Sequence, residues 1–308
     1  MVWCPNTLWG STVADWESKF ELWSKPPGTT EQQRCENAEK AIRNAINKSE
    51  KLNHRNIRVF TQGSYRNRVN VRKDSDVDIG ILCFDTFFGQ YPEGVTRESF
   101  GFTASDYSYQ QFKNEVGEAL VSHFGSLAVT RGSKAFNIKE NSYHVEADVA
   151  PFFEHRRFDK SGSYQSGVEL YPDNAAWKSI INWPEQHYEN GVTKNNATSR
   201  RYKGVVRILK TLRSELDTSG IAAAKPIPSF LVECLVWNVP NENLLRSTWR
   251  ASVRSSLAYL WNNTRTDDPC SEWGEVSELK YLFRGAQPWT RQQAHEFIDA
   301  AWNYLGFE

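Results

Sequence analysis

The spacing of hydrophobic residues in the first half of the chain changes from one segment to the next. Apolar residues recur every three to four positions over residues 31–52, which predicts a long helix. Residues 57–64 and 76–84 form short β-type runs, and the first of these ends in a glycine turn. Residues 107–124 return to helical spacing, and residues 126–153 contain three short extended segments separated by polar turns. These patterns predict strands interleaved with two helices.

The second half of the chain has a different pattern. Residues 156–176 are rich in Gly, Ser, Pro and Asp, which indicates a loop or an irregular hairpin. From about residue 177 onward helical spacing dominates, and the predicted helices are residues 198–218, 229–238, 242–263 and 290–305. Strands followed by helices indicate an α+β chain, with a mixed-sheet lobe at residues 1–176 and a helical lobe at residues 177–308. A cleft between two such lobes is a natural ligand site.

The charges of the chain balance. Its 308 residues include 37 Lys and Arg and 37 Asp and Glu, so the formal net charge is zero. Proteins that grip long nucleic acid usually carry excess positive charge, so no long nucleic-acid activator is expected. Mean hydropathy is −0.62. No apolar run approaches the roughly 20 residues that span a bilayer, and the N-terminus lacks a signal-peptide pattern, so a cytoplasmic protein without membrane contact is expected.

Two carboxylates stand at the start of the second predicted strand. Asp76 and Asp78 flank Val77, and strand side chains alternate faces, so both carboxylates point to one side roughly 7 Å apart. Such a pair is repulsive and loses hydration unless a cation lies between the two groups. A divalent ion would serve, and ligation by oxygen alone favours Mg²⁺ or Mn²⁺. The alternative is a polar turn whose carboxylates are solvated.

Two companion features favour a metal and phosphate site over a solvated turn. Gln62, Gly63 and Ser64 lie in a polar, basic loop, where a glycine lets the backbone approach a phosphate and a serine adds a hydroxyl and an N–H group. Asp148 lies in another extended apolar segment, and Glu146 on the same face is the alternative third acid. Three carboxylates could hold two metal ions, which position a triphosphate and lower the pKa of an attacking hydroxyl.

This arrangement resembles the polymerase-β-like nucleotidyltransferase superfamily, in which Gly–Ser, a spacer and Asp-x-Asp precede a later strand acid. Within about residues 25–240, the segments TQGSYRNRVNVRKDSDVDIGIL, VEADVAPFF and IPSFLVECLVWNV are similar to the bacterial cGAS/DncV-like nucleotidyltransferases, closest to clade E. The resemblance implies a nucleotidyltransferase lobe with a mixed sheet, a C-terminal helical lobe and an active site in the cleft between them.

The resemblance also implies an activity and a biological setting. Enzymes of this family join NTPs with release of pyrophosphate and close a cyclic di- or trinucleotide. The expected substrates here are ATP, with UTP or GTP as further candidates. The product is a second messenger for a separate effector of the CBASS anti-phage systems.

The same resemblance assigns roles to individual residues. It implies a metal triad of Asp76, Asp78 and Asp148 and a phosphate-binding segment of Gln62, Gly63 and Ser64. On the helix 198–218, Lys210 is expected to reach the triphosphate, with Arg207 as the second candidate and a solvated basic face as the alternative.

The segment HYENGVTKNNATS resembles the family's base pocket. Asn190, Asn195 and Asn196 could read a base edge there, although a polar turn explains any one of them equally well. In the family an Asn in this pocket is associated with pyrimidine choice, so incorporation of uridine is a hypothesis. His144 and His187 are expected to be structural or pocket-lining, because metal ions make a histidine base unnecessary.

Three alternatives stay open at this point. An NMP-transferring enzyme of the toxin or antitoxin type and an RNA-tailing polymerase would share the acids. Turnover with nucleotides alone would separate both from a cyclising enzyme. A non-catalytic nucleotide-binding scaffold is the third, and clustered carboxylates argue against it because a scaffold has no need of them.

Overall fold

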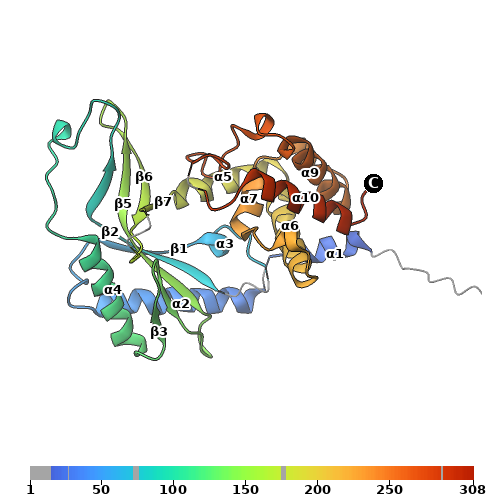
Figure 1. Cartoon of the computed structure of the whole chain (residues 1–308). Helices are drawn as coiled ribbons and strands as arrows, with labels where there is room; N and C mark the ends of the chain where they lie inside the picture. The colour runs from blue at the N-terminus through green and yellow to red at the C-terminus, as the bar shows by residue number, and fades with distance from the viewer. Residues whose placement is uncertain (1–14, 27, 72–75, 175–177, 286) are drawn as a thin grey trace, which may run out of the picture.

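The computed structural model describes the chain except for residues 1–14, 27, 72–75, 175–177 and 286. In the described part, a seven-stranded mixed sheet with helices against one face forms one lobe, and a bundle of helices forms the other (Figure 1). The strands are β1 Ile57–Gln62, β2 Val77–Gln90, β3 Val129–Arg131, β4 Phe136–Ile138, β5 Ala147–Phe158, β6 Tyr164–Leu170 and β7 Ile180–Asn182. The helices are α1 Trp16–Trp23, α2 Thr29–Lys48, α3 Gly63–Arg66, α4 Tyr109–Phe124, α5 Pro184–Ala197, α6 Arg201–Thr218, α7 Ser229–Trp237, α8 Asn241–Leu244, α9 Trp249–Thr264 and α10 Arg291–Tyr304. The α+β class expected from the sequence is confirmed. Among the described helices, none combines the length and apolar character needed to cross a bilayer.

The sheet is built around one parallel pair of strands. Its order is β1-β2-β5-β4-β3, and β6 pairs with β5 and carries β7. β2 and β5 run parallel, whereas β1, β4 and β6 are antiparallel to their neighbours. The first half of β5 pairs with β4 and the second half with β6. Because β2 and β5 are parallel, the polar residues at their two starts lie at the same end of the sheet.

Each lobe has its own hydrophobic core. In the sheet lobe, the buried side chains of Val77, Ile79 and Ile81 on β2 join a cluster with residues of α2 and α4, which cover this face (Figure 1). The core of the helical lobe is formed mainly by α6, α7, α9 and α10, and it also includes Trp16 and Phe20 of α1. The N-terminal helix α1 therefore packs with the second lobe, although it precedes the first in sequence. The boundary expected at residue 176 stays a prediction.

Two predicted elements differ from the observed ones, and a third takes one of its two expected forms. The predicted strand 76–84 continues to Gln90, because β2 resumes pairing with β5 after an irregularity between Cys83 and Phe87. The single helix predicted over 242–263 is wrong: the chain forms α8 and α9, since Thr248 caps a new helix by accepting the N–H of Ala251. The segment 156–176, expected to be a loop or an irregular hairpin, contains the β5–β6 hairpin.

Buried arginine contacts tie the two lobes together. Arg207 of α6 donates its Nε and Nη2 protons to the carbonyl of Ser24 and its Nη1 proton to the carbonyl of Arg68. Val69, which follows Arg68, has no exposed surface and lies in the core of the helical lobe. The segment that leaves α3 is therefore fixed to the second lobe, and it carries the glycine–serine turn with it.

A second contact joins α3 to α5. The carboxylate of Glu185 accepts hydrogen bonds from both Nη atoms of Arg66, and it also accepts one from Nη2 of Arg58 at 3.0 Å. These charges hold the pKa of Glu185 below its usual range, with the hydrogen bond from Arg66 as the largest cause. Arg66 lies only two residues after Ser64, so this contact also fixes the position of the turn against the helical lobe.

Replacing Arg207 with Met is expected to destabilise the protein by about 2–4 kcal/mol, because the buried carbonyls of Ser24 and Arg68 lose their charged donor. Urea unfolding followed by circular dichroism measures this loss. The control is Arg213→Met on the same helix, where a half-buried guanidinium donates to the carbonyl of Ile227 and water can replace it. An equal loss in both variants would contradict the structural role of Arg207.

Candidate active site

A row of four polar side chains crosses the sheet at the start of β2 and β5. The strand registers pair Gln62 with Asp78, Asp78 with Asp148, and Asp148 with Asn137. Neighbouring strands lie about 4.8 Å apart, so the row brings two carboxylates side by side. The flanking residues of β2 and β5 point into the core behind the sheet, which leaves this row on the opposite face. Asp76, just before β2, is exposed.

The electrostatics of the site show how close these acids are. Burial is the largest cause that raises the pKa of Asp78 to about 6; the charges of Asp148 and Asp76 add to it, and that of Lys210 opposes it. The other two predicted acids and the predicted lysine therefore all act on Asp78 through space. A search of the described residues finds no group of three His, Cys, Asp or Glu side chains that could hold a metal ion as they stand. The acids lie near one another, but in the described part of the chain their carboxylates are not close enough together to surround an ion.

The glycine of the turn is required by contact with Asp78. Gly63 has a φ of 64°, in the left-handed region, and a Cβ added to it would lie 2.0 Å from Oδ2 of Asp78. No side chain fits in that space, so the backbone of the turn lies directly against the carboxylate. Ser64 follows in α3, and its carbonyl accepts the N–H of Val69. The structure thus brings Gln62, Gly63 and Ser64 to the same end of the sheet as the acids.

Asn137 is a member of the row that the sequence did not reveal. Its Nδ2 donates to Oε1 of Glu146 at 2.6 Å and to Oδ1 of Asp148 at 3.2 Å. Glu146, the alternative third acid, precedes β5 and shares this amide donor, while Asp148 lies within the strand and in register with Asp78. The alternation in Phe136–Ile138, with an amide between two buried apolar residues, is the signal that could have identified it.

The predicted basic residues of α6 have different surroundings. Lys210 is 2% exposed, and its Nζ donates to Oε2 of Glu233 on α7 at 3.1 Å. His187 of α5 contacts the other oxygen of Glu233 at 2.8 Å. Arg207 is committed to the carbonyls of Ser24 and Arg68, so the structure does not direct it toward the acids. Glu233 also went unrecognised, because the surrounding SFLVECLVW reads as a buried helix.

The asparagines of the predicted base pocket contact backbone groups. Nδ2 of Asn190 donates to the carbonyl of Val276 at 2.9 Å. Oδ1 of Asn195 accepts the N–H of Lys203 at 3.1 Å near the start of α6, and Asn196 is exposed. The segment is the helix α5 rather than a polar turn, with Pro184 at its beginning. In this conformation, neither Asn190 nor Asn195 has its whole amide free to read a base.

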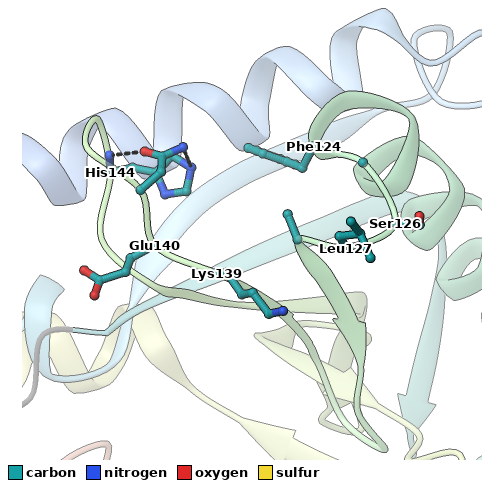
Figure 2. Close-up of a pocket in the computed structure, with 9 residues that line it drawn as sticks. Phe124, Ser126, Leu127, Lys139, Glu140 and His144 are labelled. Carbon is teal, nitrogen blue, oxygen red and sulfur yellow. Dashed lines mark hydrogen bonds between the residues drawn. The ribbon is translucent and has the colours of Figure 1, made fainter.

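A surface pocket lies away from the row of acids. It has a volume of about 540 Å³ and is lined by the end of α4 and the β4–β5 connection, including Phe124, Leu127, Lys139 and His144 (Figure 2). His144 uses both ring nitrogens locally, one toward the carbonyl of Val145 at 2.8 Å and one toward Nδ2 of Asn141 at 3.0 Å. None of the predicted catalytic acids lines this pocket.

Relatives of known activity cover nearly the whole chain. The chain is 44% identical over 292 residues to the cyclic dipyrimidine nucleotide synthase CdnE of Cecembia lonarensis, covering 94% of this chain and 98% of that protein. The enzyme of the same name from Legionella pneumophila is 42% identical over 295 residues, with 94% and 98% covered. The chain belongs to the cGAS/DncV-like nucleotidyltransferases. Its residues 189–306 also match the model of that family's C-terminal helical domain.

The fold agrees with this assignment. The structure of the Rhodothermus marinus CdnE c-UMP-AMP synthase with Apcpp and Upnpp superposes with a TM-score of 0.82 at 29% identity, covering 94% of this chain and 96% of that one. The chain is therefore a CdnE-like nucleotidyltransferase of the class that makes cyclic nucleotides. The row of acids lies on the sheet of its nucleotidyltransferase lobe.

The raised pKa of Asp78 gives a prediction about stability. The folded protein holds this proton more tightly than the unfolded chain, so ionisation of Asp78 destabilises the fold. This loss starts near the ordinary pKa of 3.8 and is complete above about pH 6. Asp78→Asn is therefore expected to stabilise the metal-free protein by roughly 1–3 kcal/mol at pH 8 and by markedly less at pH 4.5. Urea unfolding in EDTA at both pH values measures the difference.

Asp173→Asn is the matched control with the opposite sign. The hydrogen bond from Arg131 is the largest cause that lowers the pKa of Asp173, so its ionised form stabilises the fold. This control is expected to lose stability at pH 8. If Asp78→Asn were also less stable than the natural protein at pH 8, the ionised carboxylate of Asp78 would not destabilise the fold, and the prediction would be wrong.

Proposed function

We propose that this chain joins two or more NTPs into a cyclic di- or trinucleotide, with pyrophosphate as the leaving group, at the row of acids on β2 and β5. The observation that carries the proposal is the register of Asp78 with Asp148, next to a glycine turn whose backbone touches Asp78. Clustered carboxylates facing away from the core have no structural purpose of their own, and here they come at a cost in stability. The relatives are cyclic nucleotide synthases by name, which supports the same activity.

We propose two Mg²⁺ or Mn²⁺ ions as the cofactors of these acids, which would have to move closer together around the ions. Asp76, Asp78 and Asp148 offer only oxygen ligands, which hard divalent cations prefer. Burial and the charges of Asp148 and Asp76 raise the pKa of Asp78, and a bound cation would offset both effects, which supports this proposal. When bound, the ions would neutralise the triphosphate and make the attacking hydroxyl more acidic. A direct test is thermal unfolding: added Mg²⁺ should raise the melting temperature of the natural protein and have less effect on Asp78→Asn.

We propose that the phosphates of the donor NTP lie between the glycine turn and α6. Gly63 and Ser64 allow close approach of the backbone, and Gln62 lies in the row beside Asp78. Lys210 is the cation whose charge reaches Asp78. Arg207 is no longer a candidate for this role, because backbone carbonyls occupy its guanidinium.

We infer that at least one of the joined nucleotides is a pyrimidine nucleotide, with ATP, UTP and GTP as the candidate substrates. Two relatives above 40% identity are named dipyrimidine synthases, and the structural neighbour is named a c-UMP-AMP synthase. Asn190 and Asn195 are the residues proposed to face the base. Either amide would have to exchange its present backbone partner for the base.

The proposed setting is the cytoplasm of a cell defending itself against phage, where the cyclic product would act on a separate CBASS effector. This proposal rests on the family. The balanced charge of the chain supports activity that does not depend on a long nucleic acid.

The purified protein is expected to convert NTPs alone, with Mg²⁺ or Mn²⁺, into a product that resists phosphatase. Each of the four NTPs is labelled in turn with α-³²P, and products are separated by chromatography after phosphatase treatment. The labels that enter the product identify its bases. Asp148→Asn is expected to reduce the rate by about a thousandfold or more, since a charge that stabilises the transition state is removed.

The alternatives predict different outcomes in the same assay. An NMP-transferring or RNA-tailing enzyme needs a macromolecular acceptor, so label would enter product only after protein or RNA is added. A scaffold would bind NTPs without forming any product. A labelled product containing purines alone would leave the cyclic synthase in place but would overturn the inference about pyrimidines.

A further inference from the structure

A buried carboxylate lies behind the predicted phosphate-binding lysine. Glu233 is 3% exposed, and its neighbours Leu231, Val232, Cys234 and Leu235 on α7 are buried apolar residues. A charged carboxylate in such a helix costs several kcal/mol of hydration, so its presence needs a specific partner. The partners are Lys210 of α6 and His187 of α5, which contact one carboxylate oxygen each.

The contacts of Glu233 determine which atoms donate and which accept the hydrogen bonds. An ionised carboxylate can only accept, so the Nε2–H of His187 donates to Oε1 and the ammonium of Lys210 donates to Oε2. Burial alone would raise the pKa of Glu233, but the charges of Lys210 and His187 hold it well below its usual range. The carboxylate is therefore ionised and gives Lys210 a fixed, charged anchor.

The contact with Glu233 occupies one of the N–H donors of the Lys210 ammonium. Lys210 has three N–H donors, and Glu233 is the hydrogen-bond acceptor that the described residues provide for it. On the preceding turn of α6, Arg207 donates to the carbonyl of Arg68, just after the glycine turn that lies against Asp78. This part of α6 therefore lies next to the turn, and the charge of Lys210 also acts on Asp78. Two donors can therefore serve a ligand on that side while the third stays on Glu233.

Without this anchor, the ammonium would be attracted to the carboxylates of Asp78 and Asp148. A direct ion pair there would neutralise the acids and compete with divalent cations for them. Because His187, Lys210 and Glu233 come from α5, α6 and α7, the position of the ammonium is also linked to the packing of three helices.

We propose that Glu233 and His187 are positioning residues that hold the Lys210 ammonium away from the catalytic acids and direct it toward the triphosphate of the bound NTP. This inference rests on the proposed function. Neither residue touches the substrate, and both act through Lys210.

Glu233→Gln tests the proposal because it keeps the size of the side chain but removes its negative charge and one of its two acceptor oxygens. The variant is expected to bind a non-hydrolysable NTP analogue about tenfold more weakly, as measured by calorimetry in Mg²⁺, and to need several-fold more Mg²⁺ for half-maximal activity. His187→Gln is expected to show the same two changes to a smaller extent. Glu275→Gln is the matched control, because this buried glutamate of the helical lobe accepts from Gln287 and not from Lys210.

The double variant Lys210→Met/Glu233→Gln separates positioning from general damage. Removing the ammonium removes its competition for the acids, so the Mg²⁺ requirement should return toward that of the natural protein while NTP affinity stays low. A merely structural role of Glu233 predicts no such recovery. The proposal is overturned if Glu233→Gln binds the analogue as the natural protein does, or if its Mg²⁺ requirement is unchanged.

The same experiment distinguishes failure of this inference from failure of the proposed function. If the natural protein forms the cyclic product and Glu233→Gln matches it in affinity, only the inference about Glu233 falls. If the natural protein neither binds the analogue nor forms product, the proposed function falls, and the inference falls with it.

Discussion

The repulsion between carboxylates on β2 and β5 is the constraint on which the rest of this structure depends. Asp78 is placed against Asp148 by the register of the central parallel pair, and burial raises its pKa to about 6. The burial of the apolar side chains on the opposite face of the same strands, against α2 and α4, offsets this loss of stability. The turn before β2 must then avoid any side chain next to Asp78, which only Gly63 allows.

The basic side chains of the helical lobe near this site are held by specific partners. Two arginines hold the lobes together. Arg207 donates to backbone carbonyls, and Arg66 donates to the carboxylate of Glu185. Lys210 is the cation that acts on Asp78, and it is itself held by Glu233. Among the residues that the structure describes, Arg207 and Arg66 thus fix the geometry, whereas the charge of Lys210 acts on Asp78. Position along α6 alone could not have shown this, since Arg207 and Lys210 lie on neighbouring turns of one helix.

The features that sequence could predict are the local ones. The alternation around Asp76 and Asp78 and the glycine that precedes β2 lie in a single short segment, so the sequence alone indicates both the site and its class of chemistry. Asn137 and Glu233 were missed because their roles arise from contacts with residues distant in the chain. The extension of β2 to Gln90 was missed for a similar reason: pairing with the second half of β5 overrides an irregular local pattern. The break between α8 and α9 was readable in principle from the cap at Thr248.

The same constraint explains why a nucleotide should need a divalent cation here. The acids present negative charge to a triphosphate that is itself strongly negative, and the balanced charge of the chain provides no general attraction to offset this. Glu185 and Glu233 further neutralise the nearby Arg66, Arg58 and Lys210. Under the proposed function, the ammonium of Lys210 cannot by itself compensate three carboxylates and a triphosphate, so we expect binding of the nucleotide to depend on cations that enter with it. The proposal then predicts selectivity for triphosphates over long polyanions, since the positive charge would come with the ligand.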